Sequence, residues 1–112
     1  MRGAVAVAAL VMGMGVVAPA GAAPWTADDL REVCRDGYAY YAYGACAGYL
    51  SAVHDQHQGR FGTASGVCLP NDRTYFDIGE RAGEAVLQLV MVAGETGVEL
   101  ALRALRTAYP CD

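Results

Sequence analysis

The chain contains no lysine, and its eight arginines are scattered among twelve acidic residues. Proteins that bind nucleic acid neutralise phosphates with clustered lysine and arginine, so a nucleic-acid partner is not expected. An acidic surface is better suited to a basic protein partner.

The sequence also lacks an apolar run long enough to span a membrane, which takes roughly 20 residues. Its apolar run, residues 4–17, follows Arg2 and precedes an A-x-A cleavage site at residues 20–22, the pattern of an export signal. We therefore interpret residues 1–22 as a signal peptide, with a short buried N-terminal helix as the alternative. The remaining residues 23–112 are expected to form one periplasmic or secreted domain, small enough to benefit from covalent cross-links.

Closely paired cysteines are absent as well. The four cysteines, Cys34, Cys46, Cys68 and Cys111, are separated by 12, 22 and 43 positions, whereas zinc sites usually contain pairs such as C-x-x-C. An even number of cysteines in an exported chain predicts two disulfides. Cys34 follows charged residues rather than small apolar ones, so no lipid anchor on the membrane is expected.

No alternating β-pattern of useful length occurs, but three helix-start signals do. Residues 26–29, 74–77 and 96–99 each begin with threonine and carry an acid three positions later, a capping-box pattern. The first signal leads into one long helix or two in tandem, which could bend at Gly37 or Gly44. A loop is predicted at residues 56–66, a second helix ending near Gly94 follows the second signal, and Pro110 stops the last helix.

The expected fold is all-α, a small disulfide-stapled helical bundle of three to four helices. The second predicted helix has an apolar face that includes Leu89 and Val90. The last two helices, joined by only two or three residues, should pack antiparallel, and the first helical segment should cover their joint face.

The helix prediction also bears on how the disulfides connect. Along an unbroken helix Cys34 and Cys46 would lie roughly 18 Å apart, whereas bridged Cα atoms lie within about 7 Å. These two cysteines are therefore predicted not to pair. Of the remaining arrangements we favour Cys46 with Cys68 and Cys34 with Cys111.

Positive evidence for catalysis or metal binding is lacking. His54 and His57 share a helix face, but a catalytic zinc needs a third protein ligand and no candidate has matching spacing. Ser51 and Ser65 do not lie in a nucleophile elbow, and the loop glycines follow no strand that would make a phosphate-binding turn. The sequence thus predicts a binding protein rather than an enzyme, with no metal and no cofactor.

Two segments are candidates for partner binding. Tyrosine is enriched at interfaces because it offers rigid, amphipathic area, and Tyr40, Tyr41 and Tyr43 cannot all face one core. The turn at residues 94–97 could project Glu95, with Thr96 beside it, into a cleft of a partner. The exposed tyrosines are expected to supply contact area around this turn in the same binding surface. The alternatives are partial burial of the tyrosines, and caps of two helices at Gly94 and Thr96.

Three segments in order make a pattern that resembles the Rap/Tai family of periplasmic immunity proteins. Residues 46–55 fit C-x-G-Y-[IL]-x-[GA]-V-x-D, residues 68–70 fit C-x-P, and residues 108–111 fit A-[FY]-P-C. The likeness covers nearly the whole mature chain. Where many members carry an Asn-Pro-Glu turn, however, this chain has residues 93–97, and Gly79 and Gly83 lie within its second helix.

The resemblance implies an all-helical, disulfide-bonded protein, often a homodimer, that inhibits a peptidoglycan amidase delivered by type VI secretion. Inhibition in that family works by occluding the active-site cleft of the amidase, and there are no catalytic residues to carry over. The four cysteines match its structural cysteines, and Pro70 and Pro110 belong to the matched motifs. Gly48 is implied to allow close helix approach, Tyr49 to pack and Asp55 to be a polar anchor. The competing hypothesis is a small periplasmic chaperone of the acid-stress kind.

Overall fold

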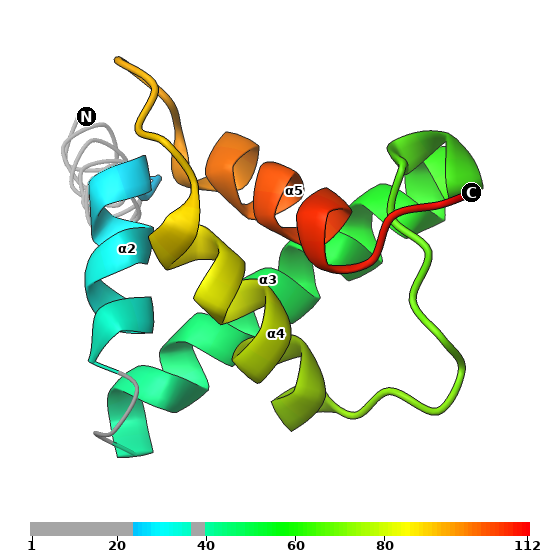
Figure 1. Ribbon diagram of the computed structural model, residues 1–112, viewed down its shortest axis with the longest axis horizontal. Coiled ribbons are helices and arrows are strands. Elements are labelled where there is room, and N and C mark those ends of the chain that lie inside the picture. Colours follow the sequence, from blue (N-terminus) through cyan, green and yellow to red (C-terminus); the bar gives the residue numbers. More distant parts are fainter. Residues whose placement is uncertain (1–23, 37–39) are drawn as a thin grey trace, which may run out of the picture.

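The computed structural model describes residues 24–36 and 40–112 and is all-α in this part of the chain, as predicted (Figure 1). The predicted signal peptide, residues 1–22, lies outside the described residues. The elements, in order, are α2 (Ala27–Arg35), α3 (Tyr40–Phe61), the 3₁₀ helix η1 (Gly62–Ser65), α4 (Tyr75–Gln88) and α5 (Gly97–Ala108).

All three capping boxes are confirmed. In α2, α4 and α5 the threonine before the helix accepts from the third backbone N–H, and the acid at that position accepts from the threonine N–H. Each box satisfies two donors that the first turn of a helix leaves unpaired. The starts of these three helices therefore follow from local sequence alone.

The predicted loop at residues 56–66 is wrong in its first half, because α3 continues to Phe61 and η1 follows directly. The polar residues at 56–58 contain neither glycine nor proline, and Gln56 and Gln58 are exposed side chains on the helix. Glutamine is a good helix former, so polarity here marks an exposed helix face and not a helix end.

Helix α4 ends earlier than predicted, at Gln88, and Gly94 is not its C-cap. The side chain of Arg31, on α2, donates to the carbonyl oxygens of Val86, Leu87 and Leu89 at 3.0, 3.2 and 3.1 Å. Carbonyls at a helix end lack intrahelical donors, and the guanidinium satisfies them. The connection to α5 is consequently residues 89–96, longer than the two or three residues expected. Helix α5 then runs back in the opposite general direction to α4 (Figure 1).

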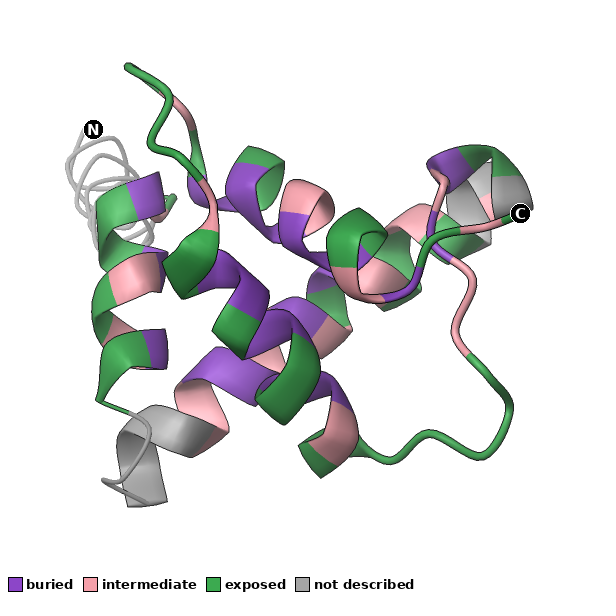
Figure 2. Cartoon of the chain, in the orientation of Figure 1, coloured by how far each residue is buried: buried purple, intermediate pink, exposed green. Residues whose placement is uncertain are grey.

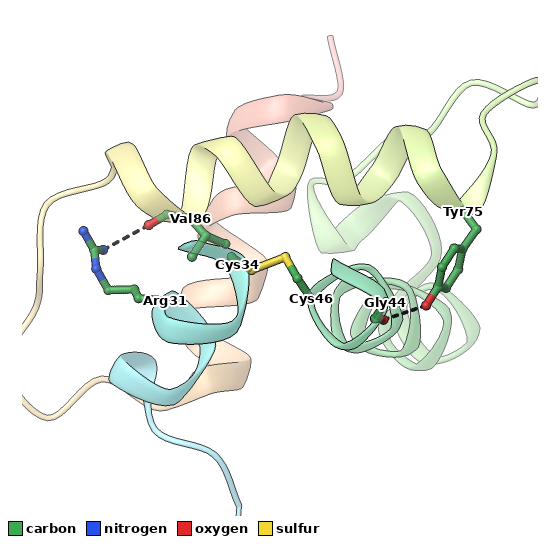
Figure 3. The surroundings of a disulfide bond; sticks show 6 residues. All are labelled: Arg31, Cys34, Gly44, Cys46, Tyr75 and Val86. Carbon is green, nitrogen blue, oxygen red and sulfur yellow. Dashed lines mark hydrogen bonds between the residues drawn. A yellow bond between two sulfur atoms is a disulfide. The ribbon is translucent and has the colours of Figure 1, made fainter. Parts of the chain in front are cut away.

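The disulfide prediction is wrong in its connectivity. Two disulfides are present, but they join Cys34 to Cys46 and Cys68 to Cys111. The first segment is two helices, α2 ending at Arg35 and α3 beginning at Tyr40, so the 18 Å separation along one unbroken helix does not apply. The Cα atoms of Cys34 and Cys46 lie 4.9 Å apart, across the α2–α3 pair (Figure 3).

The core lies where α2 packs against α3, α4 and α5, and the buried residues of Figure 2 line these facing sides. Its fully buried large side chains are Leu30, Leu50, Val67, Val86, Leu100 and Leu105. A Cβ on Gly83 would lie 3.1 Å from the Cys46 sulfur, so the absence of a side chain there lets α4 approach the first disulfide closely.

The segment before α2 is fastened to the start of α5. The Gly97 N–H donates to the Trp25 carbonyl at 2.9 Å, and the Ala27 N–H donates to the Glu95 carbonyl at 3.2 Å. The Trp25 and Tyr49 rings stack with centroids 4.7 Å apart. Gly97 is buried in this arrangement, between the tyrosine hydroxyl and the backbone of residues 25–26.

Tryptic digestion without reduction tests the disulfide connectivity directly. Cleavage after arginine should yield peptide 32–35 linked to peptide 36–60, and peptide 61–73 linked to peptide 107–112, when the masses are read by mass spectrometry. A link between peptides 32–35 and 107–112 would contradict the described pairing.

Substituting Gly97→Ala should lower the free energy of unfolding by about 1–3 kcal/mol, the usual cost of overpacking. The added Cβ would lie 2.7 Å from the Tyr49 hydroxyl and 2.9 Å from the Trp25 carbonyl oxygen. Gly44→Ala is the matched control, since its Cβ meets nothing within 4 Å. This control should gain up to about 1 kcal/mol, as expected for glycine to alanine inside a helix. Equal effects of the two changes in chemical denaturation would refute the tight packing at Gly97.

Candidate partner-binding surface

The α4–α5 loop presents three large apolar side chains to solvent. Val90 is 80% exposed, Met91 49% and Val92 50%, and we call these three residues the apolar tip. In Figures 1 and 2 the loop extends beyond the helices and is mostly exposed. Leu87 and Val98, at the adjoining helix ends, are also partly exposed.

This surface is not predicted from the sequence, because helical periodicity places Val90 on the buried face of a longer second helix. The signal that could have revealed it is the unbroken apolar run at residues 89–92. A helix with one buried face cannot bury four consecutive side chains. Here the partly buried side chain of Leu89 packs against the core, whereas the side chains of the next three residues are exposed to solvent.

The loop returns to the bundle through a tight turn. The Glu95 N–H donates to the Val92 carbonyl at 3.1 Å, and Gly94 has a φ of 75°, a conformation that favours glycine. Thr96 is the N-cap of α5, as the alternative interpretation of this turn held.

Glu95 does not project from the turn, contrary to what the sequence predicts. Its side chain is only 6% exposed, and it accepts from Arg103 Nε at 2.6 Å and Nη2 at 2.8 Å. These hydrogen bonds, together with the charge of Arg103, hold the pKa of Glu95 below its ordinary value although burial opposes the shift. The Glu95 carboxylate is therefore directed toward Arg103, two turns along α5, and not toward solvent. A contribution of Glu95 and Thr96 to partner binding stays a prediction.

An open cleft of about 700 Å³ borders the tip on one side. Residues 24–28 form one wall and residues 91–96 the other. Two backbone hydrogen bonds join these segments, from the Ala27 N–H to the Glu95 carbonyl and from the Gly97 N–H to the Trp25 carbonyl. The surface around the tip is therefore shaped as a ridge with a hollow beside it, and the exposed carboxylate of Asp28 lies at the edge of that hollow.

The predicted tyrosine cluster lies on another helix, α3. Tyr40, Tyr41 and Tyr43 lie in the first turns of α3, and their side chains fall outside the described part of the structure. The beginning of α3 lies at the opposite end of the bundle from the α4–α5 loop (Figure 1). The backbone of the first turns of α3 is thus separated from the α4–α5 loop, and a role for the tyrosines in partner binding stays a prediction.

Gly48 and Tyr49 occupy packing positions. A Cβ on Gly48 would lie 3.1 Å from the Tyr75 hydroxyl, which donates to the Gly44 carbonyl at 2.7 Å (Figure 3). The absence of a side chain at Gly48 thus leaves room for the Tyr75 ring of α4, which bonds to the backbone of α3. Burial raises the pKa of Tyr49, and the negative charge of Asp29 adds to this effect.

Of the other motif residues, Asp55 lies in the second half of α3, and Pro70 and Pro110 lie near the cysteines of the second disulfide. Asp55 is no buried anchor, since its side chain is 82% exposed and its contact is with His54 Nδ1 at 3.3 Å. Pro70 is exposed beside the second disulfide, and Pro110 pairs with Val67 in an isolated β-bridge.

The two histidines make separate local contacts. His57 Nδ1 lies 3.2 Å from the Val53 carbonyl oxygen, while His54 meets Asp55. Within residues 24–36 and 40–112 no three acidic, histidine or cysteine side chains form a group that could hold a metal ion. In the same part of the chain no helix is both long and apolar enough to cross a membrane.

Comparison with known proteins supports the resemblance seen in the sequence. The family model of the Rap1a immunity proteins matches residues 26–111. No curated protein and no solved structure matches the chain significantly. Immunity proteins bind a cognate toxin protein and are not enzymes, and two disulfides are in keeping with an extracytoplasmic location. The chain, all-α with two disulfides in its described part and matched over residues 26–111, belongs to the Rap1a immunity protein family.

Proposed function

We propose that this immunity protein neutralises a peptidoglycan amidase delivered into the periplasm by type VI secretion, and that it does so by occluding the amidase's active-site cleft. The observation that carries the proposal is the apolar tip, Val90, Met91 and Val92, held away from the core on an extended loop. The chaperone hypothesis gains nothing from the family match.

The tip has the properties of a surface that becomes buried on binding. Val90 is 80% exposed, whereas Val53, Val67 and Val86 are buried. Exposed apolar patches mark interaction sites, and the centre of an interface is where charged groups are depleted. Active-site clefts are concave and partly apolar, so a projecting apolar ridge is complementary to them in shape and polarity.

The charge around the tip favours a partner with a basic rim. Arg31 and Arg103 are both engaged within the protein, whereas Asp28 is exposed beside the tip. The predicted mature chain carries twelve acids against seven arginines. Such a surface would accelerate association with a basic partner and slow it with an acidic one.

The location follows from the predicted signal peptide. Removal of residues 1–22 would release the domain into the periplasm, where disulfides form and persist. An immunity protein there would meet the amidase in the compartment that contains peptidoglycan. The tyrosines at the start of α3 are a second proposed contact, independent of the tip.

Introducing a charge at the tip should abolish tight inhibition. Val90→Asp, Met91→Asp and Val92→Asp should each weaken inhibition of peptidoglycan hydrolysis at least tenfold, about 1.4 kcal/mol, because the carboxylate would have to be buried unpaired. The measurement uses isolated sacculi and a panel of purified type VI amidases, with thermal unfolding to verify folding.

Ala52→Asp is the matched control, since it adds the same charge at an exposed position of α3. It should inhibit as the wild type does. If the wild type inhibited no amidase of the panel, the proposed function would be contradicted. If all three tip variants inhibited as strongly as the wild type, the tip would not be the contact with the amidase.

A further inference from the structure

We propose that Arg31 and Arg103 are positioning residues that hold the α4–α5 loop in one conformation before the toxin is met. The inference rests on the proposed function, because it explains how the apolar tip is presented. Neither arginine needs to touch the partner: each acts through the loop backbone or through Glu95.

A loop of this composition has little else to order it. Residues 90–93 are exposed, so their side chains gain little from the core of their own chain. Gly94 adds conformational freedom at the returning end, since glycine populates positive and negative φ equally. If the loop became ordered only on binding, the lost conformational entropy would weaken the affinity for the partner.

Arg31 fixes where the loop leaves the bundle. Its Nη1 donates to the carbonyls of Val86 and Leu89, and its Nη2 donates to that of Leu87 (Figure 3 shows the bond to Val86). A planar guanidinium can serve several carbonyls together, which an ammonium group cannot do in the same geometry. Its positive charge also complements the negative end of the α4 dipole. Arg31, a residue of α2, thereby fixes the position of the last turn of α4 and of Leu89.

Arg103 joins the two stems of the loop. Its Nη2 donates to the Val90 carbonyl at 2.9 Å and to Glu95 Oε1 at 2.8 Å, while its Nε donates to Glu95 Oε2 at 2.6 Å. Val90 is the first residue of the tip, on the outgoing side of the loop, and Glu95 lies on the returning side. The side chain from α5 therefore closes the base of the loop, and the carboxylate neutralises its charge next to the tip.

Arg31 on α2 and Arg103 on α5 bond to the ends of the α4–α5 loop. The returning end of this loop is also fixed by backbone hydrogen bonds. Beyond Glu95, the chain is bonded to residues 25 and 27 through the Ala27 and Gly97 amides. Between these fixed ends, the loop backbone is closed by the bond from the Glu95 N–H to the Val92 carbonyl. Arg31 holds the loop at Leu89, and Arg103 holds it at Val90 and Glu95. This arrangement fits a preorganised ridge, whose order is established at folding and not at binding.

The test measures loop order in the free protein and affinity in the same variants. Arg31→Met and Arg103→Met keep apolar stem length and remove the donors. Arg35→Gln, on the same helix as Arg31 and exposed, removes an equal charge as the control. If burial of an unpaired Glu95 unfolds Arg103→Met, the double variant Glu95→Gln with Arg103→Met removes the ion pair without leaving that charge.

Backbone ¹⁵N relaxation should give tip order parameters near 0.85 in the wild type and in Arg35→Gln, and below about 0.6 in the arginine-to-methionine variants. Dissociation constants for the amidase that the wild type inhibits best should rise at least tenfold in the methionine variants only. A mobile tip in the wild type, unchanged order in both methionine variants, or lost order with unchanged affinity would each overturn the inference. Tip variants that bind poorly while Arg31→Met and Arg103→Met stay ordered would leave the proposed function standing and refute the positioning role.

Discussion

The Cys34–Cys46 disulfide holds α2 against α3, and much of the molecule depends on where α2 lies. From that position α2 packs on α3, α4 and α5, and Leu30 is completely buried among them. The same helix carries Arg31 to the end of α4, where the guanidinium satisfies three carbonyls. The disulfide and this packing together place Arg31, three residues before Cys34, at the end of α4, where the candidate binding loop begins.

Features specified within a few residues were predictable, and features that depend on distant partners were not. Thr26, Thr74 and Thr96 begin helices because each capping box is complete within four residues. The end of α4 depends on Arg31, more than fifty positions earlier, and its local signal is the apolar run at residues 89–92. The disulfide pairing failed for a related reason, because a separation of 12 positions excludes a bridge only if the helix is unbroken.

The candidate site shows the same division. Composition and cysteine number led to a disulfide-stapled binding domain, and the motifs at residues 46–55, 68–70 and 108–111 led to the family that residues 26–111 match. The α4–α5 connection stays a candidate segment, but the sequence predicts Glu95 as its projecting residue, whereas Arg103 holds that carboxylate inward. The exposed residues are Val90, Met91 and Val92, which periodicity had assigned to a helix.

An immunity protein of this size can achieve tight inhibition if its few contact residues are already in place, and the structure supplies a means in the constrained base of the loop. The central claim is that this loop enters the active-site cleft of an amidase. Replacing Met91 with a photo-reactive amino acid, irradiating the complex and sequencing the cross-linked peptides tests the claim most directly. The account predicts cross-links to residues lining the amidase's active-site cleft, and none when the probe is placed at Ala52. Cross-links from position 91 to a surface remote from that cleft, or inhibition without any cross-link from it, would contradict the account.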